Sequence, residues 1–179
     1  MQVKVWMKST VITLTLAAVF HIVTVTILPD VIMAFVSKKA LHSLKASVNT
    51  AIHRPRITDD QETIVMPCPD LLYTICVYDV SQKPLRIKAP TPKDTYFSIA
   101  MYAANTDNFF VVNDRQLAND GREILLINKG ASYSGSGNFW VVEAPTSKGI
   151  ILCRTLITDE NRMEDMIRIQ HQVTIAEVQ

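Results

Sequence analysis

The apolar residues of this chain follow two unlike patterns, and the first lies near the N-terminus. Ser9–Leu28 is a run of twenty residues without Asp, Glu, Lys or Arg, and eleven of them are Val, Ile, Leu or Phe. At about 1.5 Å per helical residue the run is ~30 Å long, the thickness of a bilayer core. It is longer than the core of a signal peptide, and no A-x-A cleavage site follows it. We therefore predict an uncleaved transmembrane anchor.

Polar residues inside this run fit the same interpretation. Threonine hydroxyls can bond back to the helix backbone, which keeps their cost in lipid small. The threonines concerned are Thr10, Thr13, Thr15, Thr24 and Thr26. His21 reads as a neutral imidazole, the alternative being a proton or metal ligand that faces a partner helix. Pro29 predicts a kink or a helix boundary. A second helix is expected over Val31–Val48, joining anchor to domain.

After Pro55 the pattern becomes strand-like. Leu71–Val80 alternates, which places Leu72, Thr74, Cys76 and Tyr78 on one face. Further β-branched and aromatic runs predict strands at Glu62–Pro67, Leu85–Ala89, Tyr96–Ala104, Phe109–Asn113, Glu123–Asn128, Phe139–Ala144 and Ile150–Thr158. Turn residues separate the runs, and the Gly130–Gly137 segment is interpreted as a hairpin loop. Short, evenly spaced strands predict a β-sandwich or jelly-roll-like domain.

The end of the chain returns to helical spacing. Thr158 or Asp159 can cap a helix that contains Met163 and Met166 and lies across the sandwich. The predicted fold class is mainly β, with an N-terminal transmembrane helix and a C-terminal helix. We divide the chain into an anchor (1–37), a basic juxtamembrane helix and linker (38–60) and the β-domain (61–179).

Charge adds one local feature. The net charge of +1 gives no signal for nucleic acid, so no nucleic-acid partner is expected. Residues 38–58, however, contain five basic residues and no acid. These are candidates for contact with lipid headgroups, the alternative being a solvated surface. They are Lys38, Lys39, Lys45, Arg54 and Arg56. Lysines flank both sides of the anchor, so the charge count leaves the membrane face of the domain open.

Candidate chemistry is sparse. The sequence has no recognisable nucleophile, phosphate-loop or metal-binding motif, so no cofactor or metal is predicted. Cys76 and Cys153 lie in apolar strands and are expected to be small buried thiols. Arg154 interrupts an apolar strand and needs an acidic partner, for which we predict Asp79 or Asp107.

Several phrases in order resemble the bacterial domain-of-unknown-function family 1254, in a short membrane-anchored form. They are Met66–Tyr73, Tyr78–Ser81, Asp94–Ile99, Asn105–Phe109 and Leu152–Thr155. Where longer members carry Pro-Asn-x-Asp-Thr-x-Tyr, this chain keeps Asp70 and Tyr73 but has Cys68 and Leu71 for Asn and Thr. The resemblance implies a β-sandwich-like fold and a bacterial inner-membrane protein with a periplasmic domain. It implies no assigned reaction.

The resemblance also implies a partner. Longer members fuse a domain like this one to a second β-rich domain, family 1214, which has no counterpart in this sequence. We therefore expect the second domain on a separate chain, in addition to contact with the lipid bilayer.

Three functions remain open. The favoured one is a non-enzymatic binding or assembly subunit of a membrane complex. Its candidate contact residues are Tyr102, Phe109, Phe110 and Trp140. The second is an envelope hydrolase acting on glycan or lipid, which needs two carboxylates in one cleft. Its candidate site residues are Asp70, Tyr73, Asp79, Asp107 and Arg154. The third is lipid or small-molecule binding inside the sandwich.

Overall fold

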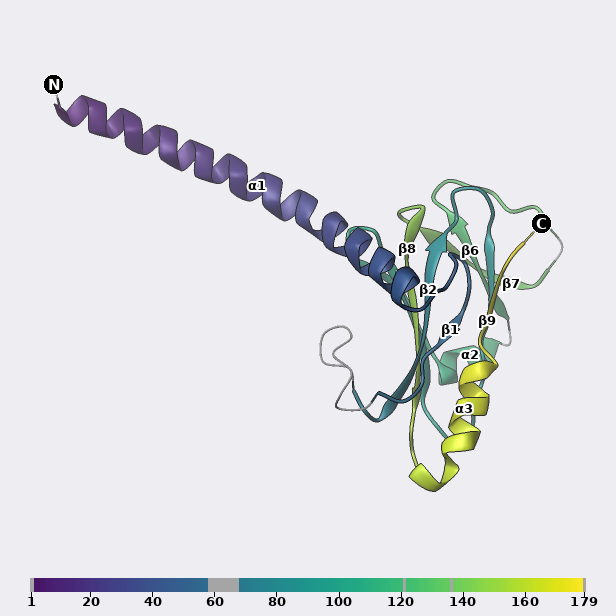
Figure 1. Ribbon diagram of the computed structural model, residues 1–179. Helices are drawn as coiled ribbons and strands as arrows, with labels where there is room; N and C mark the ends of the chain where they lie inside the picture. The colour runs from purple at the N-terminus through teal and green to yellow at the C-terminus, as the bar shows by residue number, and fades with distance from the viewer. Residues whose placement is uncertain (1, 58–67, 121, 136, 179) are drawn as a thin grey trace.

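A long N-terminal helix stands out from a two-layered β-domain in the computed structural model (Figure 1), which describes residues 2–57, 68–120, 122–135 and 137–178. Helix α1 spans Gln2–Ser43 and includes Pro29 in its interior. The helix therefore does not end at Pro29, and the second helix predicted over Val31–Val48 is the continuation of α1. The strand predicted at Glu62–Pro67 lies outside the described residues.

The outer part of α1 is exposed. Its apolar side chains are exposed, Phe20 to 73% and Leu16 to 64%. The helix is long and apolar enough to cross a membrane, a criterion that N-terminal signal sequences also meet. All five threonine hydroxyls named above donate to backbone carbonyls three or four residues earlier, which confirms that prediction.

The inner part of α1 is docked on the domain. Met33 and Ala40, seven residues apart and so on one face of the helix, are buried, with only 9% and 5% of their surface exposed. The contacts are with strands β2 (Leu71–Asp79) and β8 (Lys148–Leu156). Figure 1 shows that α1 reaches the five-stranded sheet from the side opposite β9 and β7.

The first sheet is five-stranded, in the order β1-β2-β8-β4-β5, and every pairing is antiparallel. The remaining members are β1 (Ile52–His53), β4 (Phe97–Ala103) and β5 (Asn108–Asn113). Along β8, buried residues alternate with residues that are half-buried or, at Lys148, exposed. One face of this sheet is thus the core face, and the other, which we call the outer face, carries the contact with α1.

The second sheet is four-stranded, in the order β7-β6-β3-β9. Its members are β3 (Leu85–Lys88), β6 (Glu123–Asn128), β7 (Phe139–Ala144) and β9 (Thr174–Glu177). Fully buried residues from both sheets form one hydrophobic cluster, including Met101, Ile151, Leu85 and Leu126. The two sheets therefore pack face to face, which confirms the predicted mainly β, sandwich-like fold.

Three short helices complete the second layer. They are α2 (Asp114–Asp120), the 3₁₀ turn η1 (Glu160–Arg162) and α3 (Met163–His171). The Asp159 carboxylate accepts a hydrogen bond from the Asn161 N–H and so caps η1. The predicted cap therefore belongs to the 3₁₀ turn that leads into α3, and α3 itself begins after Arg162 without a side-chain cap. Helix α3 contacts β2 and β8, and Figure 1 shows it continuing the layer of β9.

The prediction of a hairpin loop at Gly130–Gly137 is wrong. β7 pairs with β6 in parallel, so the intervening residues carry the chain back along the strand instead of turning it directly. Ten residues separate Asn128 from Phe139, and at ~3.3 Å each they can retrace the length of a six-residue strand. Turn residues alone do not distinguish these two connections.

Candidate functional site

Asp70 lies at the opposite end of the five-stranded sheet from the other two candidate carboxylates. Asp79 is the last residue of β2 and Asp70 precedes its first, so nine strand positions and ~30 Å separate them. Asp107 lies in the turn after β4, at the same end of the sheet as Asp79, and β8 stands between β2 and β4. Its carboxylate accepts a hydrogen bond from the Asn105 amide at 2.6 Å, so it has a local partner of its own.

Asp79 is held in a local structural role. Its Oδ1 accepts a hydrogen bond from the Ser81 N–H at 2.9 Å, and Lys148 Nζ lies 3.3 Å from its other oxygen. Partial burial would raise the pKa of Asp79, but the Ser81 hydrogen bonds and the Lys148 ammonium together lower it. The carboxylate therefore stays ionised, which does not suit a general acid.

The predicted partners of Arg154 are wrong. Arg154 stands mid-strand on β8, six residues from Lys148, and its cross-strand neighbours are Tyr73 on β2 and Ser98 on β4. Asp79 is paired with Lys148 at the end of the sheet, ~20 Å away along the strand. Alternation along a strand indicates which face Arg154 occupies, but not which neighbouring strand supplies its partner.

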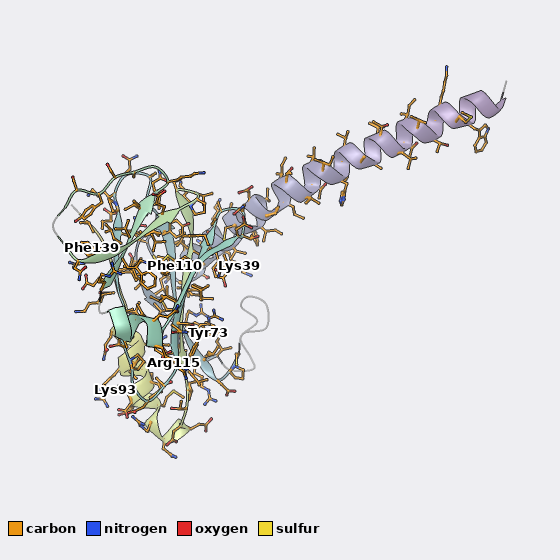
Figure 2. The ribbon with its side chains drawn as sticks, turned by 180° about the vertical axis from the view of Figure 1, so that it is seen from behind. Lys39, Tyr73, Lys93, Phe110, Arg115 and Phe139 are labelled. Carbon is orange, nitrogen blue, oxygen red and sulfur yellow. The ribbon has the colours of Figure 1, made fainter. Side chains whose placement is uncertain are left out.

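A row of polar side chains crosses the outer face at this level. In register from strand to strand, it consists of Tyr73, Arg154, Ser98 and Asn113. We call these four residues the polar row. Figure 2 shows Tyr73 on this sheet, lower than Lys39 at the docked part of α1. On the same outer face, the next positions along the strands are apolar: Ile75, Leu152 and Ala100.

Two polar atoms at the centre of the row lack partners. Arg154 Nε and Ser98 Oγ are both inaccessible to solvent, and neither makes a hydrogen bond with any residue that the structure describes. Ser98 is fully buried. The outer members are engaged: the Tyr73 hydroxyl accepts a hydrogen bond from the Cys68 N–H at 3.0 Å, and Asn113 Oδ1 accepts one from the Gln116 N–H.

The structure thus brings together Tyr73 and Arg154 of the five proposed site residues, and places Asp79 and Asp107 at the other end of the sheet. Ser98 and Asn113 were not identified from the sequence. A signal for Ser98 was present, because it is the polar residue between Phe97 and Ile99 in an otherwise apolar strand. Its meaning depends on the β4–β8 register, which sequence spacing does not determine.

The aromatic candidates for partner contact are mostly part of the domain's own packing. Phe109, Phe110 and Trp140 are half-buried against the core cluster, and the rings of Phe110 and Trp140 meet edge to face at 5.3 Å. The ring of Phe109 packs in the same way against Tyr78. Tyr102 is half-buried on the outer face, paired with Ile150.

The basic candidates divide into two groups. Lys38, Lys39 and Lys45 are exposed around the docked end of α1. Arg56 is engaged within the domain, since its guanidinium lies 2.9 Å from Glu160 and donates to the Pro69 carbonyl. Arg54 is half-buried, and its carbonyl accepts a hydrogen bond from Gln170.

The cysteine and histidine side chains are the remaining reactive groups. Cys76 and Cys153 are buried free thiols, as predicted, and burial raises the pKa of Cys76 to about 12. The rings of His53 and His171 stack at 4.4 Å, and His53 Nδ1 lies 2.9 Å from Thr74 Oγ1. Among the described residues no three His, Cys, Asp or Glu side chains cluster as metal ligands.

One family model and two solved structures are similar to this chain. A family model described as "Protein of unknown function (DUF1254)" matches residues 48–177. The VPA0106 protein of Vibrio parahaemolyticus has a similar structure, with a TM-score of 0.66, 13% sequence identity and 84% of this chain covered. An uncharacterised protein from Burkholderia cenocepacia matches with a TM-score of 0.49, 18% identity and 82% coverage.

The chain spans 35% of the Vibrio protein and 40% of the Burkholderia protein. No curated protein matches the chain.

Proposed function

Because this chain belongs to the DUF1254 family of unknown function, we propose its role from its own structure: a membrane-anchored β-sandwich that acts as a binding or assembly subunit of a bacterial envelope complex. The observation that carries the proposal is the continuity of α1. One uninterrupted helix joins the exposed apolar run to the segment that packs on β2 and β8. A continuous helix of this kind would hold the β-domain at a fixed distance from the membrane.

The docking of α1 also supports retention of the helix over cleavage. Met33 and Ala40 bury their side chains on the sheet, only five and twelve residues beyond the apolar run. Cleavage within the apolar run would remove the turns that lead into this contact. The exposed Lys38, Lys39 and Lys45 then lie close enough to the membrane side to meet anionic headgroups, at ~1 kcal/mol each.

A binding role fits the side chains better than hydrolysis does. The five candidate hydrolase residues do not gather in one place, whereas an arginine and a serine side by side on the outer face have polar atoms without partners among the described residues. The proposed partner is a separate polypeptide that carries a second β-rich domain. The resemblance to longer family members, which carry such a domain, suggests this partner.

The test is affinity capture of the tagged full-length chain from membranes in mild detergent, with mass spectrometry of what is recovered. Stoichiometric recovery of one other membrane or envelope protein is the expected result. A matched control replaces Lys38 and Lys39 by Gln. This change removes two lysine charges that would face the lipid headgroups, and it leaves the folded domain intact. Recovery of the chain alone, with both forms, would contradict the assembly role.

A further inference from the structure

The middle of the polar row contains two polar atoms without partners among the described residues, Arg154 Nε and Ser98 Oγ. Arg154 is half-buried, and no described residue accepts a hydrogen bond from it or forms an ion pair with it. The Nε atom of this guanidinium is inaccessible to solvent, and a buried donor that lacks an acceptor is costly. The absence of such a partner in this part of the chain points to an acceptor that comes from outside.

Ser98 is the second, independent observation. It is fully buried, it is the direct cross-strand neighbour of Arg154, and its hydroxyl has no partner among the described residues. The large majority of buried side-chain polar atoms in native proteins have a hydrogen-bond partner, so two neighbouring exceptions on one face call for a common explanation. A ligand oxygen at this point would accept from both groups.

Tyr73 on β2 is the cross-strand neighbour of Arg154 on the side opposite Ser98. Its hydroxyl oxygen accepts from the Cys68 N–H, which leaves the hydroxyl proton available for donation. The three side chains offer a planar guanidinium fork between two hydroxyl groups. A fork of this kind matches the paired oxygens of a carboxylate or phosphate group.

We infer that Tyr73, Arg154 and Ser98 form a binding subsite for an oxyanion, the phosphate or carboxylate group of a ligand, on the outer face of the five-stranded sheet. The inference specifies the ligand chemistry of the proposed binding role, but it does not depend on the anchor or on a protein partner. The oxyanion has two natural sources, a soluble anion and a lipid headgroup. The outer face is also the face that α1 meets, so headgroups approach from this side.

The test measures unfolding of the full-length chain in a nonionic detergent, followed by tryptophan fluorescence. One arm compares sodium phosphate with sodium chloride at equal ionic strength. The other compares micelles containing phosphatidylglycerol with micelles containing phosphatidylcholine. A ligand that binds only the folded state stabilises it in proportion to the logarithm of its concentration.

Wild-type protein is expected to respond to at least one arm. In Arg154→Gln the apparent Kd rises at least about tenfold, the loss expected for a charge-assisted hydrogen bond. The matched control is Arg86→Gln, on a strand of the other sheet, where Arg86 is exposed beside Glu123. This control is expected to respond as wild type does.

The arms separate the two sources. A response to phosphate identifies a soluble anion, and a response to phosphatidylglycerol alone identifies a headgroup. If Arg154→Gln fails to fold, Arg154→Lys and Tyr73→Phe supply the comparison, and both are expected to weaken binding. The inference is overturned if wild type responds to neither arm, or if the Arg154 or Tyr73 variants respond like wild type. A chain that binds an oxyanion but captures no protein would retain this site and lose the assembly role.

Discussion

Gln170 offers the sharpest test of how the C-terminal helix is attached to the sheet. It lies in α3, only 2% of its surface is exposed, and its side-chain amide donates to two carbonyls at 2.9 Å each, those of Arg54 and Tyr73. The Tyr73 carbonyl also accepts from the Arg54 N–H, so it keeps a partner without Gln170. The Arg54 carbonyl has Gln170 as its donor. Gln170→Met removes both bonds while almost preserving side-chain volume.

The expected cost follows from these contacts. Each net hydrogen bond contributes about 0.5–1.5 kcal/mol, so losing two lowers the free energy of unfolding by about 1–3 kcal/mol. At about 2–4 °C per kcal/mol for a chain of this size, a loss of about 2 kcal/mol lowers Tm by roughly 4–8 °C.

The assay is denaturant unfolding of the full-length chain in detergent. The chain has two tryptophans, and Trp6→Phe leaves the half-buried Trp140 as the reporter from β7. The matched control is Gln172→Met, the same change at an exposed position two residues later, which is expected to stay within about 0.5 kcal/mol of wild type. Equal stability of the two Met variants would refute the assigned role of Gln170.

Three further predictions use the same unfolding assay. The Cβ added in Gly149→Ala would lie 2.0 Å from the Tyr102 carbonyl oxygen, a backbone atom that cannot move aside alone. The free energy of unfolding should fall by at least about 1–3 kcal/mol, and near-wild-type stability would contradict the β4–β8 register. Burial, followed by the charge of the stacked His171, lowers the pKa of His53, so the His53 imidazole is protonated at a higher pH in the unfolded state than in the folded state. The free energy of unfolding should therefore decline as pH falls below the ordinary histidine pKa of about 6.5, and His53→Gln should flatten this slope. Arg154→Met, measured without added oxyanion, should leave stability unchanged or raise it, because no ion pair with a described residue is lost; a loss above about 3 kcal/mol would show that the arginine has a structural partner.

The alternation of buried and exposed positions made the strands predictable. β6 and β7 have the bounds that the sequence indicates, and the other predicted strands among the described residues differ by one or two residues at their ends. Such runs carry their own signal, because one face of each strand packs in the core.

The elements that were missed lack this signal. β1 is two residues long and β9 four, and both depend on pairing with a neighbour, β2 and β3 respectively. Pro29 was expected to interrupt the N-terminal helix, but α1 passes through it and is held on its far side by packing on β2 and β8. Tertiary contacts decide these segments, and they cannot be read from local pattern.

The candidate site was predictable only in part. Arg154 stood out as a charge in an apolar strand, and Tyr73 as a residue shared with the family phrase. Their adjacency requires the β2–β8 register, and the role of Ser98 requires the β4–β8 register as well. Neither register follows from spacing along the chain, because the strands are separated by loops and by other strands.

Alkaline carbonate extraction of membranes, followed by intact-mass and peptide analysis of the protein, tests whether α1 is a retained anchor of the β-domain. We expect the chain to stay in the membrane pellet and to yield peptides spanning Trp6 to Leu28, the exposed apolar part of α1. Recovery of the domain in the soluble fraction, without those residues, would show that the helix is a cleaved signal and would contradict the claim.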